Sequence, residues 1–315
     1  MLILLITLPL LAAITAGLYF YWIHSPLPTV PALTGTLQQT SISFGDMQRT
    51  YLSYIPAGLK PGAPLLVVLH GRGIDSARMR IFTGYQFERL ADQHGFAVVY
   101  PDGYGKGWND CRKAASAPAK VKNVDDVGFL RALVDEIHGE SAIDTARVYA
   151  MGYSNGGQMA FRLIAEQPAM LAGLAVAGTN LPATADLLCS FSQPTPPMML
   201  VSGTADSIIP YEGGEVSLFG RRNSGSVVSS QSTAEFFAEK SRAQEYHRGP
   251  SITVADGTAI EIQTWSTDAQ QRVALYSIRG GGHVVPQTAY RFPRIMGKTT
   301  QGFDMPAASV AFFGL

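Results

Sequence analysis

The strongest constraint on the fold of this chain is a set of short apolar runs that alternate with helical patterns. The runs are PLLVVLH (64–70), FAVVY (96–100), RVYAM (147–151), LAGLAVAG (171–178) and PMMLVSG (197–203). Such runs are typical of strands that are buried on both faces of a sheet. Because these strands alternate with helices, the sequence predicts an α/β fold with helices on both faces of a mostly parallel central sheet.

Helices are predicted between these strands from apolar spacing and end signals. Acidic Asp125 and Asp126 suit a helix N-terminus, and apolar residues follow with helical spacing at 130, 133, 134 and 137. Further helices are expected near 83–94, 156–167, 229–244 and 304–313. Two antiparallel strands are expected within 37–56 and a late strand at 272–278, whereas 104–123 and 212–228 have no clear pattern.

The N-terminal segment 1–23 is predicted to be a separate apolar helix, because residues 2–23 contain no charge. About 20 apolar residues can cross a bilayer, and Tyr19, Tyr21 and Trp22 are residue types found at membrane interfaces. A cleaved signal peptide is the alternative. Either reading predicts export, as a protein anchored on the non-cytoplasmic side of a membrane or as a secreted or periplasmic one. A Pro-rich spacer (24–36) then leads to one domain over 37–315.

Composition argues against several classes of protein. Hydrophobic residues make up 46% of the chain and the formal net charge is zero, so a large core is expected and a nucleic-acid partner is not. Cys111 and Cys189 are too few for a structural zinc site, and no metal or organic cofactor is expected. The loops that carry the two cysteines emerge at the same edge of the sheet, so they either form a disulfide or stay free and buried.

The segment Gly152-Tyr153-Ser154-Asn155-Gly156 lies where a buried strand is followed directly by a helix. Gly-x-Ser-x-Gly at such a place predicts a nucleophile elbow, a sharp turn that lifts the serine hydroxyl above the sheet. Side chains at Gly152 and Gly156 would collide there. The N–H groups at the start of the helix favour negative charge that develops beside the serine. An ordinary tight turn is the alternative reading.

A serine nucleophile needs a base and an acid that orients the base. In a fold of this kind the order along the chain is serine, then acid, then histidine. Only His247 and His283 follow Ser154. His283 is the predicted base, because it comes directly after a strand in a glycine-rich loop. His247 lies in a polar stretch that is expected to be a solvated loop. Asp206 is the predicted acid, because it lies just past the C-terminal end of a buried strand. The acidic residues in weaker contexts are Asp186, Asp256 and Asp268.

Two backbone N–H groups are predicted to hold an oxyanion. One is that of Asn155, directly after the nucleophile, and the other is that of Arg72 in the loop HGRG (70–73). His70 is expected to brace this loop. Trp108 and Tyr153 are the expected substrate contacts, with packing in the core as the alternative for Trp108.

Several motifs occur in a fixed order along the chain, and together they resemble a known family. They are RTYLSYIP, LLVVLHG, YPDG with WND, VDDVGFL, RVYAMGYSNGGQMAFRL, GTAD and GGGH. From about residue 45 to the C-terminus, the sequence resembles the polyhydroxybutyrate depolymerase and feruloyl esterase-like family of α/β-hydrolases, related to carbohydrate esterase family 1. The resemblance places the catalytic triad on Ser154, Asp206 and His283. It implies an exported serine esterase that hydrolyses short-chain acyl, hydroxybutyrate, acetyl or feruloyl esters, small or polymeric, through an acyl-enzyme.

Two other functions fit parts of the same pattern. A serine peptidase of the prolyl oligopeptidase type shares the triad and the fold, but it usually carries a gating domain for which 315 residues leave little room. A membrane-tethered binding protein with an inert hydrolase fold would be expected to have lost a triad residue, and all three are present here.

Overall fold

The computed structural model describes residues 2–218, 220, 224–268 and 270–315, with side chains described from residue 11 onward. In this part of the chain one sheet has the strand order β1-β2-β4-β3-β5-β6-β7-β13-β12-β10, with β11 beside β12. The strands on the N-terminal side are β1 (Thr36–Phe44), β2 (Met47–Ile55), β3 (Leu65–Leu69), β4 (Ala97–Pro101) and β5 (Val148–Tyr153). Those that follow are β6 (Gly173–Ala177), β7 (Met198–Gly203), β10 (Glu245–Arg248), β11 (Ile252–Thr253), β12 (Ala259–Thr267) and β13 (Gln270–Arg279). A small ribbon pairs β8 (Gly214–Glu215) with β9 (Ser226–Val227).

The centre of the sheet is parallel and its two sides are antiparallel. Neighbours from β4 through β3, β5, β6 and β7 to β13 all run parallel. At one side β1 and β2 form a hairpin that joins β4, and at the other β12 and β10 run antiparallel to their neighbours. The parallel strands therefore bring their C-terminal ends, and the loops that follow them, to one edge of the domain.

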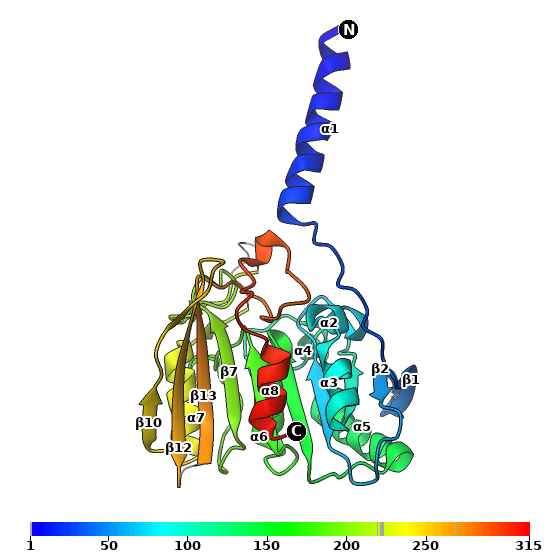
Figure 1. Ribbon diagram of the computed structural model, residues 1–315, viewed down its shortest axis with the longest axis vertical. Coiled ribbons are helices and arrows are strands. Elements are labelled where there is room, and N and C mark those ends of the chain that lie inside the picture. The colour runs from blue at the N-terminus through cyan, green and yellow to red at the C-terminus, as the bar shows by residue number, and fades with distance from the viewer. Residues whose placement is uncertain (1, 219, 221–223, 269) are drawn as a thin grey trace.

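Helices cover both faces of the sheet (Figure 1). They are α2 (Ser76–Phe82), α3 (Gln86–His94), α4 (Pro118–Val121), α5 (Asp126–Ser141), α6 (Asn155–Glu166), α7 (Ser230–Lys240) and α8 (Met305–Phe313), with a short 3₁₀ turn η1 (Arg294–Met296). Side chains of β3 alternate between two cores: Leu65, Val67 and Leu69 pack with α5, α6 and α7, whereas Leu66 and Val68 pack with α2, α3 and α8. This alternation follows from the two-residue period of a strand.

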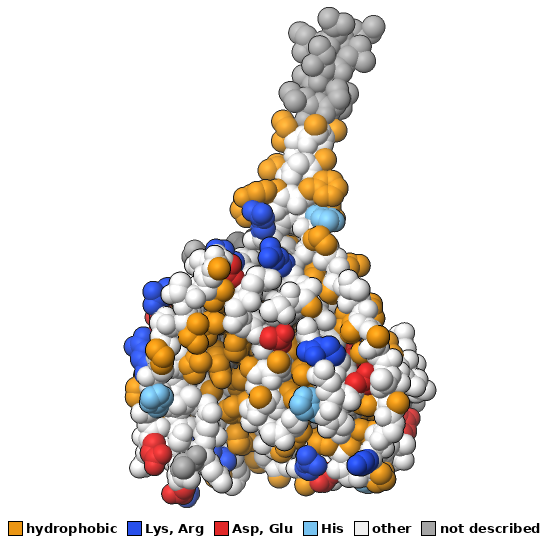
Figure 2. Space-filling model, viewed as in Figure 1, with side chains coloured by type: hydrophobic (Ala, Val, Ile, Leu, Met, Phe, Trp, Pro, Cys, Tyr) orange, Lys and Arg blue, Asp and Glu red, His pale blue; other side chains and the backbone are white. Residues whose placement is uncertain are grey.

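The N-terminal helix α1 (Leu2–Trp22) projects from the domain as a stem (Figure 1). Its described side chains are exposed and largely apolar, including Leu18, Phe20 and Trp22. Hydrophobic side chains gather along the described part of this stem in Figure 2. At its base, the guanidinium of Arg294 lies over the ring of Tyr21, with 4.4 Å to the ring centroid. Within the described residues, no helix is both long and apolar enough to cross a membrane. The side chains of 2–10, on which the prediction of an anchor over 1–23 also depends, lie outside that description.

The predicted α/β architecture and its buried strands are confirmed, and most corrections concern polar segments. The helix expected at 83–94 begins only at Gln86, and α2 before it was not predicted. The prediction of a loop around His247 was wrong, since this residue lies in β10. All four residues of β10 are exposed, so this edge strand lacks the apolar pattern that identifies a strand. The same antiparallel extension contains β12, which was also not predicted from the sequence pattern.

Candidate active site

Ser154 lies at the sharp turn between β5 and α6, with φ 54° and ψ −119°. A positive φ is rare for a residue with a side chain, so this serine is held in a strained conformation by its surroundings. The two flanking glycines are needed for the close approach. A Cβ at Gly156 would lie 2.3 Å from the carbonyl oxygen of Leu69, and one at Gly152 would lie 2.6 Å from that of Gly156.

Three side chains from distant parts of the chain form a hydrogen-bonded series at the C-terminal edge of the sheet. Oγ of Ser154 lies 2.9 Å from Nε2 of His283, and Nδ1 of His283 lies 2.7 Å from Oδ2 of Asp206. Asp206 follows β7, and His283 follows β13. Because these two strands are parallel neighbours, their following loops meet at one place. This arrangement is the one that general-base activation of a serine hydroxyl requires.

Both partners of Ser154 are held in place by further hydrogen bonds. The other carboxylate oxygen of Asp206 accepts hydrogen bonds from the backbone N–H groups of Ile208 and Ile209, each at 2.8 Å. The hydroxyl of Tyr153 donates to the backbone oxygen of His283 at 2.8 Å. Burial raises the pKa of Tyr153 well above its usual value, so the hydroxyl keeps its proton and remains a donor. The imidazole and the carboxylate are thus oriented before a substrate binds.

The HGRG loop (70–73) lies directly over the nucleophile. A Cβ built at Gly71 would be 3.4 Å from Cβ of Ser154. His70 is fully buried and braces this loop: its Nε2 accepts a hydrogen bond from the N–H of Gly103 at 2.9 Å, and its Nδ1 lies 2.7 Å from the oxygen of Gly71. Desolvation lowers the pKa of His70, which keeps the ring neutral and fits this division into one acceptor and one donor.

The backbone N–H groups of Arg72 and Asn155 are the two donors that the sequence predicts for an oxyanion. Among the hydrogen bonds of the described residues, neither group donates to another part of the chain. By contrast, the N–H of Gly73 is occupied, since it donates to the oxygen of Lys106 at 2.7 Å. Both residues line the same cavity as Ser154, so their backbone donors stay candidates for binding an oxyanion.

A buried polar network, which the sequence reading did not predict in this form, fixes the turn to the loop after β4. The side-chain oxygen of Asn155 accepts from the N–H of Trp108 at 2.8 Å, and its amide nitrogen donates to Asp110 at 2.6 Å. Asp110 also pairs with Arg112 at 2.5 Å. The next residue, Cys111, forms a disulfide with Cys189 across a separation of 78 residues, which confirms one of the two alternatives for these cysteines. The motif WND signalled this loop, but not its partner on the nucleophile turn.

A cavity of about 330 Å³ opens beside Ser154 and His283. One wall is apolar and comes from loops around the site, with Ile74, Phe82, Ile208, Ile209, Val216, Leu218 and Met296. Tyr153 lines the cavity, as expected for a substrate contact. Trp108 does not: its side chain is fully buried, and its indole N–H donates to the oxygen of His70 at 2.9 Å. The expected contact between Trp108 and substrate is therefore replaced by a packing role under the 70–73 loop.

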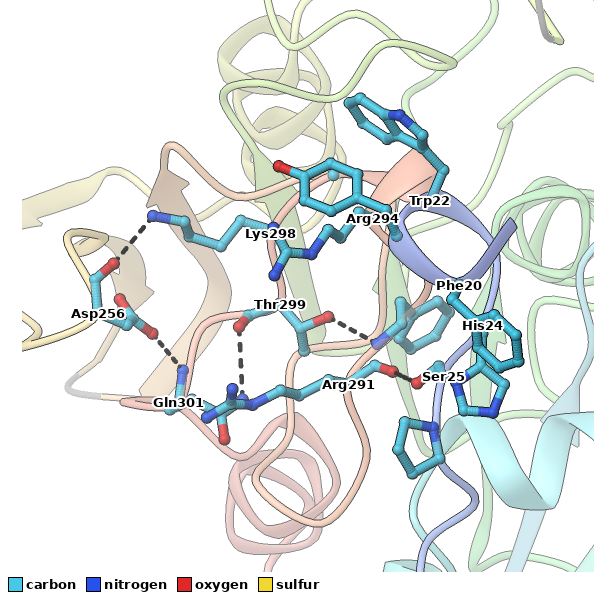
Figure 3. A pocket seen from close by; sticks show the side chains of 14 residues that line it. Phe20, Trp22, His24, Ser25, Asp256, Arg291, Arg294, Lys298, Thr299 and Gln301 are labelled. Carbon is cyan, nitrogen blue, oxygen red and sulfur yellow. Dashed lines mark hydrogen bonds between the residues drawn. The ribbon is translucent and has the colours of Figure 1, made fainter. Parts of the chain in front are cut away.

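A second, larger cavity of about 750 Å³ lies between the base of α1 and the loop 291–301 (Figure 3). It is lined by aromatic residues of α1 and by exposed cations of the loop, including Arg291 and Lys298. It contains none of Ser154, Asp206 or His283, so the smaller cavity is the one that fits chemistry at the serine. Among the described residues there is no group of three or more His, Cys, Asp or Glu side chains that could hold a metal ion.

Known proteins resemble this chain in both sequence and fold. A family model described as esterase PHB depolymerase matches residues 49–210, a range that includes Ser154 and Asp206 and ends before His283. "Putative esterase NocK" of Nocardia uniformis subsp. tsuyamanensis is 30% identical over 304 residues, which are 91% of this chain and 86% of that protein. Feruloyl esterase C of Emericella nidulans is 26% identical over 66% of this chain and 72% of its own. The structure of an acetyl xylan esterase from Aspergillus awamori matches with a TM-score of 0.56 at 18% identity, covering 89% of this chain and 99% of that one.

Proposed function

Since the chain belongs to the PHB depolymerase esterase family and is a carboxylic ester hydrolase, we propose that it works through a catalytic triad of Ser154, His283 and Asp206. The observation that carries this proposal is the continuous hydrogen-bonded series from Oγ of Ser154 through His283 to Asp206. Its order along the chain is the one typical of α/β-hydrolases.

In the first half of the proposed reaction, Nε2 of His283 takes the proton of Ser154 while Oγ attacks the ester carbonyl. The carbonyl oxygen becomes an oxyanion, which the N–H groups of Arg72 and Asn155 hold. The bond to the leaving oxygen then breaks, and His283 gives its proton to the departing alcohol. An acyl-enzyme on Ser154 remains.

In the second half, a water molecule loses a proton to Nε2 of His283 and attacks the acyl carbon. Collapse of the second tetrahedral intermediate returns the proton to Oγ of Ser154 and releases the carboxylic acid. Asp206 stays ionised throughout, holds the imidazole in the tautomer with a proton on Nδ1, and stabilises the imidazolium that forms in each half. These steps use only residues of this chain and water.

The cavity supports small acyl or aromatic acyl esters as substrates. Its volume of about 330 Å³ is at the lower end of the range for small-molecule sites. Its apolar wall, which includes Ile208, Val216 and Met296, offers hydrocarbon contacts next to His283. Short-chain acyl, hydroxybutyryl, acetyl and feruloyl groups all fit this description.

The triad is tested by the variant Ser154→Ala with 4-nitrophenyl acetate as substrate. We expect kcat/KM to fall by at least about 1,000-fold, because the nucleophile is lost while binding is kept. The matched control is Ser251→Ala, which changes an exposed serine that does not line the cavity beside Ser154 and should behave as wild type. Turnover in Ser154→Ala close to that of wild type, with a correctly folded protein, would contradict the proposal.

We further propose that the segment 1–23 directs export, either as a membrane anchor or as a cleaved signal. Residues 2–23 carry no charge, and the apolar side chains of 11–23 are exposed in the folded chain. Exposed apolar surface of this extent is usually covered by a membrane or a partner. Cell fractionation combined with N-terminal sequencing distinguishes the two forms. A full-length chain that stays in the cytosol would refute both.

A further inference from the structure

The charge of the cavity beside Ser154 is one-sided. Its lining contains two arginines, Arg72 and Arg112, and among the described residues it contains no aspartate or glutamate. The other titratable side chains in the described lining are His283, which is the proposed base, and Tyr153. A cationic side chain in the lining of a small cavity attracts anionic groups of a ligand, unless a nearby carboxylate neutralises its charge.

The two arginines differ in how their charge is balanced. Arg112 is buried and pairs with the fully buried carboxylate of Asp110 at 2.5 Å, so this pair adds little net charge. Among the described residues, the guanidinium of Arg72 donates to two neutral groups, the hydroxyl and the backbone oxygen of Ser116, each at 3.1 Å. The nearby carboxylate of Asp75 is instead paired with Lys106 at 2.8 Å. Within the described part of the chain, Arg72 therefore has a guanidinium whose charge no carboxylate neutralises.

Arg72 also belongs to the lining of the cavity in which an ester would meet Ser154. In the sequence Arg72 follows Gly71, whose Cβ position would lie 3.4 Å from Cβ of Ser154. Arg72 and Ser154 both line the same cavity. A guanidinium has five N–H donors, so the two hydrogen bonds to Ser116 leave donors for a ligand. A carboxylate is the group that accepts them best, because it can take two parallel hydrogen bonds together with the opposite charge.

We propose that the preferred substrate is an ester that also carries a free carboxylate, which the guanidinium of Arg72 binds while Ser154 attacks the ester carbonyl. This inference rests on the proposed esterase function and names its substrate class. The class includes monoesters of dicarboxylic acids, with the carboxylate on the acyl side, and acylated hydroxy acids, with the carboxylate on the alcohol side. The apolar wall, including Ile208 and Met296, contacts the hydrocarbon between the two ends.

The test uses two pairs of esters that differ only in charge. For the acyl side the pair is mono-4-nitrophenyl adipate and 4-nitrophenyl adipamate, and for the alcohol side it is 3-(butyryloxy)butanoate and 3-(butyryloxy)butanamide. The full-length enzyme should hydrolyse the carboxylate of at least one pair with a kcat/KM about 10-fold above that of the amide at low salt. Added salt should reduce this ratio, because Arg72 is exposed and its charge is screened.

The variants Arg72→Gln and Arg72→Lys assign the preference to this side chain. Arg72→Gln should bring the ratio close to one, and Arg72→Lys should keep part of it, because a single ammonium keeps the charge but not the paired donors. The ratio is read within one variant, so a general loss of activity does not affect it. The control Arg78→Gln removes an exposed cation of α2 that does not line the cavity, and it should leave the ratio unchanged.

Three results would overturn the inference. Equal rates on both members of both pairs would show that charge is not recognised, although esterase activity stands. A preference that persists in Arg72→Gln would assign it to another group. A lack of hydrolysis of all four esters by the wild-type enzyme would refute the proposed function itself, and the inference with it.

Discussion

The disulfide between Cys111 and Cys189 should be a major contributor to stability. The variant Cys111→Ala/Cys189→Ala removes a cross-link that closes a loop with a sequence separation of 78 residues. For a loop of this length, the loss of chain entropy in the unfolded state corresponds to about 4.5 kcal/mol at 25 °C. We expect the free energy of unfolding to fall by an amount of this order.

The structure indicates that the effect acts mainly on the unfolded state. The two loops stay joined beside the bridge, since the N–H of Leu188 donates to the oxygen of Cys111 at 2.9 Å and the N–H of Lys113 donates to that of Asp186 at 2.7 Å. The folded variant should therefore keep its local geometry and most of its esterase activity under native conditions.

The assay is guanidinium unfolding, followed by fluorescence, with and without a phosphine reductant. Reduction should lower the midpoint of the wild-type protein to that of the double variant, and it should not change the midpoint of the variant. A thiol assay on the unfolded protein checks that reduction is complete. An unchanged wild-type midpoint with two free thiols present would refute the reasoning.

Two further predictions follow from buried polar groups. Asp110→Asn leaves the buried guanidinium of Arg112 without its carboxylate, so the free energy of unfolding should fall by about 3 kcal/mol. The kcat should also fall, because the side chain of Asn155 loses the carboxylate to which it donates. Unfolding curves and 4-nitrophenyl acetate kinetics measure the two effects, and wild-type values of both would contradict the role of the network. Burial, and then the hydrogen bond to Asp92, raises the pKa of Tyr54 from 10.0 to about 12. Since the unfolded chain loses this proton first, the stability that Tyr54 contributes is present below pH 10 and should be lost between about pH 10 and 12. Unfolding curves across this window should show a shallower decline for Tyr54→Phe, and an equal slope would refute the assignment.

The parts of the fold that the sequence predicted are those governed by burial. The strands that contain Leu66, Val99, Ala150 and Met199 are almost entirely apolar, because helices cover both of their faces. An apolar run of this kind can be recognised in the sequence. The exposed edge strand β10 has no such requirement, since its side chains face water. Its residues pair with β12 through the backbone and through polar side chains at the surface, such as Tyr246 with Gln263 and Arg248 with Glu261. Contacts of this kind do not require an apolar sequence pattern.

The positions of Ser154, Asp206 and His283 could be predicted because each follows directly from a strand end. A parallel sheet brings such ends to one edge, whatever their distance along the chain. Whether the side chain of Trp108 is buried or contacts substrate could not be predicted in this way. Its loop has no regular secondary structure around it, and only the contacts of its indole with His70 and of its backbone with Asn155 decide that it is buried rather than exposed to substrate.

The uncompensated charge of Arg72 in the cavity lining could not be predicted from the sequence. Asp110 lies two residues before Arg112, which favours a local polar network, and the structure shows this pair. For Arg72, only the fold shows that no carboxylate of the described residues pairs with it. Pairing between side chains in irregular loops depends on distances of a few ångström, which neither residue type nor spacing determines.

Ser154 is the proposed nucleophile, and labelling with diisopropyl fluorophosphate tests this assignment most directly. The full-length protein is treated with the reagent, esterase activity is followed over time, and the modified residue is identified by peptide mass spectrometry. We expect one phosphoryl adduct per chain, on the peptide that contains Ser154, formed at the same rate as activity is lost. An adduct on another residue, or esterase activity that continues while Ser154 is fully modified, would contradict the account.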